Sequence, residues 1–226
     1  MNFLFDFDST LVKTESLNEV LNIALQNNTE KISQIDQITK MAMEGLITPQ
    51  DSMSQRLKLA TINKSLIEQI SNKTKNEITT GMVDLILELK KHKNVNIFII
   101  SGGFKEIIIP TAKILGIPEN HIYANQFIYD KNNIVQGVKE NILLEEQGKV
   151  KTINNLKNTG TLKGKNIMIG DGFTDLETLL YNAVDDYICF CGVIEREKVK
   201  SKSNNIVKNT DELKKFCLQK IQELNI

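Results

Sequence analysis

The feature that most limits how this chain can fold is the apolar run at its amino terminus, which ends in two carboxylates. Phe3 to Phe7 leads into Asp6-Phe7-Asp8-Ser9-Thr10. A run this short and aromatic-rich, bounded by turn formers, is typical of a buried strand. Because side chains alternate along a strand, Asp6 and Asp8 are expected to leave the same face or the strand end together. Two buried carboxylates are costly without a cation or donors, so this strand end predicts a positive partner. A plain strand-to-loop turn is the alternative, since Asp and Ser are common turn residues.

Residues 13–77 have apolar side chains at helical spacing and no strand pattern. The spacing predicts helices over 16–28 and 31–43, a third that begins at Pro49 with Thr48 as its cap, and a fourth around 66–70. This segment is therefore expected to form a small helical bundle.

From Gly81 onward, predicted helices alternate with short apolar strands. The expected elements are helices over 82–91, 104–115, 149–156, 174–181 and 211–223, strands over 95–100, 121–124, 166–169 and 187–190, and a hairpin over 127–138. Such alternation predicts an α/β fold with a doubly wound parallel (Rossmann-like) sheet, which the first strand joins. The helical bundle is then a cap inserted after that strand, giving a core domain of 1–12 and 78–226 and a cap domain of 13–77.

The charge balance of the chain argues against a nucleic-acid or membrane partner. Lys and Arg together number 28, as do Asp and Glu, so no global field draws the protein to a polyanion. No apolar run has the length of a membrane span, and the first residues do not resemble a secretion signal. Three cysteines do not form a disulfide framework. We expect a protein in the reducing cytoplasm.

Four places at or near expected strand ends carry residues suited to chemistry. They are the Asp6–Thr10 stretch, Ser101-Gly102-Gly103 before a helix, Lys149 at a helix start, and Gly170-Asp171-Gly172-Phe173-Thr174-Asp175. Ligands of open α/β sheets bind beyond the carboxyl ends of the strands, so these places should meet. The carboxylates of Asp6, Asp8, Asp171 and Asp175 are hard oxygen ligands of the kind that Mg²⁺ prefers.

The same set contains groups that suit a phosphate. Ser101 and the N–H groups of Gly102 and Gly103 could bind phosphate oxygens, and Lys149 adds a compact positive charge. Each motif alone is more often a simple turn or a surface group, but their order and joint position favour phosphoryl transfer. A carboxylate can act as the nucleophile in that chemistry and form an aspartyl-phosphate.

In this order the motifs resemble those of the haloacid dehalogenase superfamily, and in particular its phosphoserine phosphatase branch. The first motif is Asp6-Phe7-Asp8-Ser9-Thr10-Leu11, the second Ser101-Gly102-Gly103-Phe104, the third Gly148-Lys149, and the fourth the Gly170–Asp175 stretch. The resemblance implies a Mg²⁺-dependent phosphatase that releases serine from O-phosphoserine. Its expected partner is a small phosphorylated amino acid, and its expected assembly a monomer or a homodimer.

The resemblance also implies a role for each catalytic and metal-binding residue. Asp6 would accept the phosphoryl group, and Asp8 would protonate the leaving alcohol and then activate water. Asp6, the main-chain carbonyl of Asp8 and Asp171 would hold Mg²⁺, with Asp175 supporting them. Ser101, Gly102 and Lys149 would bind the phosphate.

In the cap, the resemblance assigns Glu15 to the substrate ammonium and Arg56 to its carboxylate, a pairing that suits both groups. Met43 is a candidate for the cap pocket or for the bundle core. Thr174, counted here as a substrate-binding residue, stands where many members have Asn, and Gln50 where the branch often has an acid. The sequence assigns no function to residues 192–197. The same chemistry on phosphoethanolamine, phosphothreonine or a sugar phosphate stays open, as does a receiver-like domain that accepts phosphate on Asp.

Overall fold

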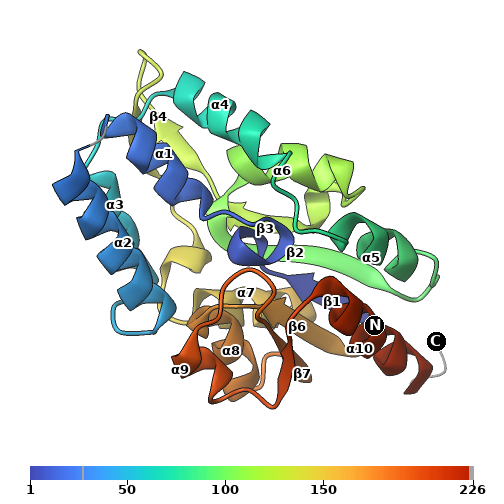
Figure 1. Ribbon diagram of the computed structural model, residues 1–226. Coiled ribbons are helices and arrows are strands. Elements are labelled where there is room, and N and C mark those ends of the chain that lie inside the picture. Colours follow the sequence, from blue (N-terminus) through green and yellow to red (C-terminus); the bar gives the residue numbers. More distant parts are fainter. Residues whose placement is uncertain (27, 224–226) are drawn as a thin grey trace.

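The computed structural model describes residues 1–26 and 28–223, and at its centre is a six-stranded parallel sheet (Figure 1). The strands are β1 (Asn2–Phe5), β2 (Asn96–Phe104), β3 (Ile122–Asn125), β6 (Asn166–Gly170), β7 (Asp186–Phe190) and β8 (Asn205–Val207). Their order is β3-β2-β1-β6-β7-β8, with every neighbouring pair parallel. The predicted doubly wound sheet is confirmed. The strand order reverses direction at β1, and ligands of such sheets bind in the crevice at the carboxyl end of that switch point.

Helices cover both faces of the sheet, which is why its strands are apolar on both sides. Phe3 and Phe5 of β1 share one core with residues of α5 (Met82–Leu89), α6 (Lys105–Ile114) and α10 (Thr210–Glu223). Leu4 points the other way, into a core with α7 (Gly148–Asn158), α8 (Phe173–Leu180) and α9 (Glu197–Lys200). These three β1 side chains are fully buried, and burial of such a side chain contributes about 1.5–3 kcal/mol. The hydrophobic effect therefore fixes the register of β1 and with it the position of the residue that follows.

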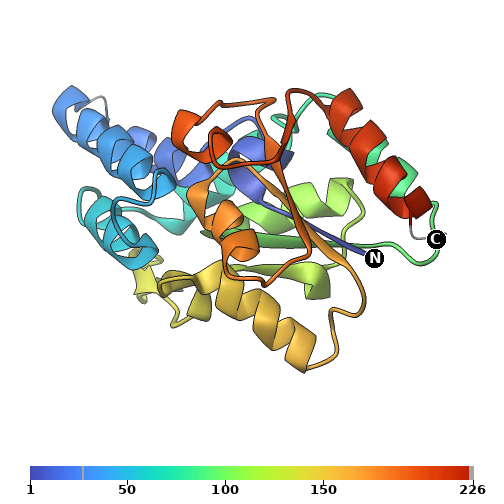
Figure 2. The same ribbon diagram turned by 90° about the horizontal axis from the view of Figure 1, so that it is seen from below.

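Four helices lie between β1 and α5 along the chain: α1 (Ser16–Ala24), α2 (Thr29–Met43), α3 (Pro49–Leu57) and α4 (Lys64–Thr74). In Figures 1 and 2, α1 to α3 lie at the opposite end of the molecule from the two chain termini. The Thr48 side chain accepts a hydrogen bond from the Asp51 N–H, and Pro49 is the first helical residue, as predicted. The bundle therefore stands beside the carboxyl ends of the strands, where the sheet binds ligands.

The first of these helices is shorter than the predicted 16–28. It ends at Ala24, Gln26 has a φ of 49°, and the Asn28 side chain caps the next helix by accepting from the Lys31 N–H. Residue 27 lies outside the described part of the chain. Asn is more favourable at a helix N-cap than inside a helix. Asn28 therefore begins α2 and does not extend α1.

The predicted hairpin is present as β4 (Phe127–Tyr129) and β5 (Val135–Val138), which pair antiparallel outside the main sheet. The sequence did not predict β8, α9, or the short 3₁₀ turns Glu119–His121 and Ile142–Leu144. These elements have three or four residues each, which is too short for a periodic apolar pattern to stand out.

Two predictions about the motif-bearing loops are wrong. β1 ends at Phe5, and residues Phe7–Leu11 form a tight turn with π-helical hydrogen bonding, in which Ser9 has a left-handed φ of 53°. Strand alternation therefore does not relate Asp6 to Asp8. The strand expected over 95–100 does not end before Ser101-Gly102-Gly103 either: β2 continues through this segment to Phe104, and the helix that follows, α6, begins at Lys105. Phe104 extends the strand by pairing with Asn125 of β3 and stacking on Phe127.

Within residues 1–26 and 28–223, we find no helix with both the length and the apolar character needed to cross a lipid bilayer.

Candidate active site

Asp6 is the first residue after β1, at the switch point of the sheet. Its Oδ1 accepts a hydrogen bond from the Phe7 N–H at 2.8 Å, and the residue is 7% exposed. The ammonium of Lys149, near the start of α7, lies 3.0 Å from the same Oδ1. Both contacts use Oδ1, so among the described hydrogen bonds Oδ2 of Asp6 has no partner.

Lys149 joins Asp6 to Asp175 in a buried ion-pair network. Its Nζ lies 2.6 Å from Asp175 Oδ1, and the lysine is 6% exposed. Burial disfavours the ammonium, but the carboxylates of Asp175 and Asp6 outweigh it and raise the pKa of Lys149 above its usual value. The predicted positive partner of the first strand end is therefore present, and it comes from a helix more than a hundred residues away in sequence.

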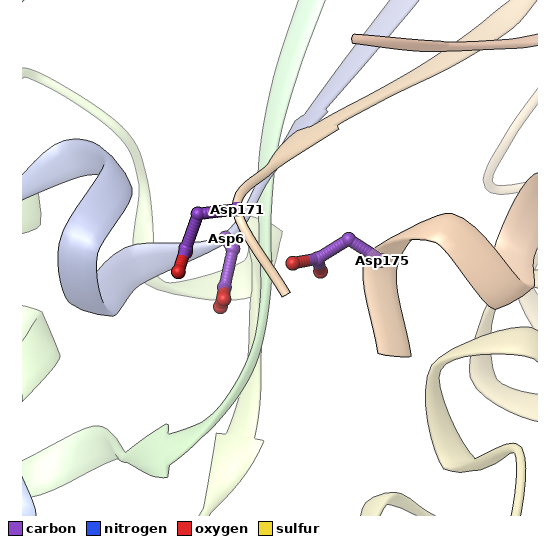
Figure 3. A group of neighbouring side chains, drawn as sticks. All are labelled: Asp6, Asp171 and Asp175. Carbon is purple, nitrogen blue, oxygen red and sulfur yellow. The ribbon is translucent and has the colours of Figure 1, made fainter. Parts of the chain in front are cut away.

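Asp171 and Asp175 follow β6 and complete a triad with Asp6 (Figure 3). One carboxylate oxygen from each of the three lies within 4.8 Å of the others. Asp175 Oδ2 accepts from the Gly172 N–H at 3.0 Å, and a side chain on Gly170 would collide with this carboxyl. The glycine therefore lets the carboxylate fold back against the strand end.

The electrostatics of this triad are those of a cation site. Burial raises the pKa of Asp171 to about 7 and that of Asp175 to about 8, although Arg196 and Lys149 respectively oppose the change. Burial disfavours the negative charge of Asp171 and Asp175, and a hard divalent ion such as Mg²⁺ is the best compensation for three carboxylates at this spacing. The donor set therefore fits the metal that the sequence predicted.

The side chain of Asp8 takes a different direction from that of Asp6. Its Oδ1 accepts from the Ser16 N–H at 3.0 Å and its Oδ2 from the Ser16 hydroxyl at 3.1 Å. Burial, and then the negative charge of Glu15, raise the pKa of Asp8 well above its usual value. Asp8 is therefore held as a carboxyl that favours the protonated form, beside Asp6 but not in the triad.

The Ser101–Gly103 segment at the end of β2 is fixed by side-chain hydrogen bonds. The Gly103 N–H donates to Ser101 Oγ at 3.0 Å, and the Asn125 amide donates to the Gly102 carbonyl at 2.8 Å. Ser101 is 1% exposed, whereas Gly102 is open to solvent. Asn125 was not among the predicted site residues, although it follows an expected strand and is polar.

A cavity of about 90 Å³ lies between the end of the sheet and helices α1 to α3. Its walls include seven of the ten predicted site residues: Asp8, Glu15, Arg56, Ser101, Gly102, Lys149 and Thr174. The other three, Asp6, Asp171 and Asp175, form the adjoining triad, of which Lys149 binds two members. Met43 also lines the cavity. The structure thus brings all ten predicted residues to one place.

Arg56 is a buried cation with neutral partners. Its guanidinium donates to Asn18 Oδ1 at 3.2 Å, Thr39 Oγ1 at 3.5 Å and the Ser52 carbonyl at 3.4 Å. Burial lowers the pKa of Arg56, and among the described residues no carboxylate forms an ion pair with it. A buried guanidinium that faces a cavity and forms no ion pair with the described carboxylates is suited to bind the carboxylate of a ligand.

Glu15 and Arg196 form a contact that the sequence did not predict. Glu15 Oε1 accepts from Ser9 Oγ at 2.8 Å and from Arg196 Nη2 at 2.8 Å. Arg196 Nε also donates to Asp171 Oδ2 at 2.6 Å. The stretch 192–197 therefore reaches the site, and one signal pointed to it, because Arg196 and Arg56 are the only arginines in the chain.

Chemically, the arrangement combines a carboxylate whose Oδ2 has no partner among the described hydrogen bonds, a carboxyl whose pKa is raised by burial, a buried ammonium and a cavity with charged groups of both signs. Such a set suits nucleophilic attack by a carboxylate on a phosphate ester, with an acid beside it.

Comparison with known proteins finds relatives that match most of the chain. A model of the haloacid dehalogenase-like hydrolase family matches residues 3–180. The chloroplastic phosphoserine phosphatase of Arabidopsis thaliana is 30% identical over 204 residues, covering 90% of this chain and 67% of its own. The Mus musculus phosphoserine phosphatase is 32% identical over 197 residues, which cover 87% of this chain and 84% of the mouse protein. A crystal structure of a phosphoserine phosphohydrolase-like protein from Francisella tularensis superposes with a TM-score of 0.88 at 35% identity. The superposition covers 95% of this chain and 98% of the Francisella chain.

Proposed function

The chain belongs to the haloacid dehalogenase-like hydrolases, and from this premise we propose that it hydrolyses O-phosphoserine to serine and phosphate through a phosphorylated Asp6. The observation that carries the proposal is the cavity itself. It has Ser101 and Lys149 beside the nucleophile, the carboxylate of Glu15, and the cation Arg56, which forms no ion pair within the described residues. These groups match, in charge, the phosphate, the carboxylate and the ammonium of phosphoserine.

In the proposed reaction, Asp6 Oδ2 attacks phosphorus and the ester bond to the serine oxygen breaks. Lys149 and the Phe7 N–H hold Oδ1, so the free oxygen is oriented for attack. Lys149, Ser101 and the exposed Gly102 N–H bind the phosphoryl oxygens as their charge changes. Donors fixed before the reaction stabilise that charge without reorganising, which is the main source of such catalysis.

Asp8 serves as acid and then as base. It gives its proton to the leaving serine oxygen, and afterwards takes one from the water that attacks the aspartyl-phosphate. Phosphate leaves and Asp6 is regenerated. Its two hydrogen bonds from Ser16 keep the Asp8 carboxyl oriented through both steps.

Mg²⁺ fits the donor set of Asp6, Asp171 and the main-chain carbonyl of Asp8, with Asp175 nearby, and would neutralise negative charge on the phosphoryl oxygens. Asp175 contributes by holding Lys149.

The substrate's amino-acid part would lie under the cap, for which we propose residues 13–77 over a core of 1–12 and 78–226. The planar guanidinium of Arg56 can donate two parallel hydrogen bonds to a carboxylate, and the carboxylate of Glu15 can pair with an ammonium. Thr174, on the first turn of α8, lines the same cavity and can donate a hydroxyl hydrogen bond. Phosphoethanolamine lacks the carboxylate, and sugar phosphates lack both the carboxylate and the ammonium. The first would leave Arg56 without a substrate partner, and the second would leave both Arg56 and Glu15 without one.

The proposal is tested by phosphate release from a panel of small phosphate esters after metal has been removed with EDTA. We expect little release without metal, restoration by Mg²⁺, and the highest kcat/KM for phosphoserine. Full activity in EDTA would contradict the metal assignment. A higher kcat/KM for phosphoethanolamine or a sugar phosphate would contradict the substrate assignment alone.

Replacing Arg56 should change substrate choice more than chemistry. We expect Arg56→Ala to lower kcat/KM for phosphoserine by about 10²-fold, because a charged hydrogen-bonded pair is worth about 1.5–3 kcal/mol. The loss for phosphoethanolamine, which has no carboxylate, should be less than about tenfold. Steady-state kinetics on both esters measure the two losses.

Two further variants sharpen this test. Arg56→Lys keeps the charge but not the fork, and should recover only part of the phosphoserine activity. Lys58→Ala removes an exposed cation two residues further along the chain, and should leave kcat/KM unchanged for both esters. Equal losses on both esters in Arg56→Ala would count against carboxylate recognition.

A further inference from the structure

Arg196 lies on the loop between β7 and α9 and joins two carboxylates from distant parts of the chain. Its Nε donates to Asp171 Oδ2 at 2.6 Å and its Nη2 to Glu15 Oε1 at 2.8 Å. The arginine side chain is 10% exposed and the Asp171 side chain 3%, so this is a nearly buried, forked ion pair. Such pairs depend on both partners, because either one alone would be a buried uncompensated charge.

Both oxygens of Asp171 are already in use. The Thr10 hydroxyl donates to Oδ1 at 3.2 Å, and Arg196 occupies Oδ2. Asp171 is also one member of the triad whose oxygens lie within 4.8 Å of each other. A divalent ion held by this triad therefore has to share or replace one of these two contacts.

The cations of the site divide the triad between them. Lys149 lies against Asp6 and Asp175, and Arg196 lies against Asp171. In the part of the chain that the structure describes, each triad carboxylate thus has a basic side chain beside it. These contacts partly offset the mutual repulsion of three carboxylates in a small buried volume.

We propose that Arg196 is an internal counter-ion that Mg²⁺ and the substrate ammonium displace. On loading, the metal takes Asp171 Oδ2 and the guanidinium moves away. The same movement frees Glu15 for the ammonium of the substrate. One side chain thereby links metal loading to the preparation of the amine subsite. This inference rests on the proposed function, because it takes the triad as the metal centre and Glu15 as the ammonium ligand.

The loop around Arg196 is anchored in a way that allows the side chain to move alone. Val199 of α9 is fully buried, and the N–H groups of Val199 and Lys200 both donate to the Arg196 carbonyl at 2.9 Å. The backbone can therefore stay in place while the guanidinium changes partners.

The test measures Mg²⁺ binding itself, by calorimetry on EDTA-treated and dialysed protein without substrate. Arg196→Met keeps an unbranched side chain but removes the charge, which leaves Asp171 short of a cation until metal arrives. We expect its Kd for Mg²⁺ to fall by about tenfold or more. Arg196→Lys, which keeps the charge but lacks the fork, should give a smaller change.

Lys198→Met is the matched control. It removes the same charge two residues away, from an ion pair whose lysine is 56% exposed, and should leave the Kd within about twofold of the wild-type value. An unchanged or higher Kd in Arg196→Met would overturn the inference, since it would make the arginine neutral or helpful to metal binding.

Thermal unfolding gives a second measurement that does not depend on activity. In EDTA the melting temperature of Arg196→Met should lie below that of wild type, and Mg²⁺ should raise it by more than it raises the wild type. An equal rise in both proteins would also count against displacement. If wild-type protein neither binds Mg²⁺ nor hydrolyses phosphoserine, the proposed function fails. If it does both and the Arg196→Met Kd is unchanged, only this inference fails.

Discussion

Asp6→Asn is expected to lower the rate of phosphate release from phosphoserine by more than about 10⁴-fold, the scale on which enzymes lose activity with their nucleophile. An amide oxygen cannot form the aspartyl-phosphate, so the first step of the proposed reaction has no acceptor. The fold should survive, because the Asn amide oxygen can still accept from the Phe7 N–H and from Lys149 as Asp6 Oδ1 does. Steady-state phosphate release and circular dichroism on the same preparation measure the two effects.

Asp36→Asn is the matched control for this variant. Asp36 is exposed on α2, so the same chemical change there should leave both activity and stability near wild type. Mass spectrometry after brief exposure to phosphoserine adds an independent readout, because only protein with Asp6 should gain a phosphoryl group. Asp6→Asn protein with a tenth of wild-type activity would rule out Asp6 as the nucleophile.

The fold could be predicted largely because its signals are local. β1, β6 and β7 are short apolar runs, and the helices between them carry regular apolar stripes, so periodicity alone gives their order. Parallel pairing and the position of the ligand crevice follow from that order. The prediction failed where a few residues decide the geometry, as in the turn Phe7–Leu11 with its left-handed Ser9.

The candidate site could be predicted for residues within recognisable motifs, and not for those that reach it from elsewhere. Lys149 and Asp171 stand next to glycines at the boundaries of expected elements, and these short motifs marked them as candidate site residues. Asn125 and Arg196 stand in no such motif, and only the folded chain brings them to Gly102 and Asp171. A side-chain contact across more than twenty residues of sequence depends on packing that no local pattern encodes.

Lys149→Met is the second change for which we expect a large effect, this time on stability as well as turnover. The ammonium lies 3.0 Å from Asp6 and 2.6 Å from Asp175, and its removal leaves two buried carboxylates without their cation. Breaking a buried ion pair in this way costs about 3–5 kcal/mol in free energy of unfolding. Turnover should fall by more than about 10²-fold, since a fixed donor to the phosphoryl group is lost.

Urea unfolding in EDTA and in Mg²⁺ separates the two roles of Lys149. In EDTA we expect the full loss of stability. In Mg²⁺ the loss should be smaller, because a divalent ion at the triad supplies positive charge to the same carboxylates. A loss of equal size in both conditions would mean that no metal binds beside Asp6 and Asp175.

Lys151→Met tests whether the effect belongs to the buried position or to any lysine of α7. Lys151 pairs with Glu145, but their side chains are 43% and 54% exposed. Water screens such a pair, so its loss should change the free energy of unfolding by less than about 1 kcal/mol and leave turnover unchanged. If Lys149→Met were as mild as Lys151→Met, the ammonium would not be what holds Asp6 and Asp175 together, and the catalytic arrangement would need another cation.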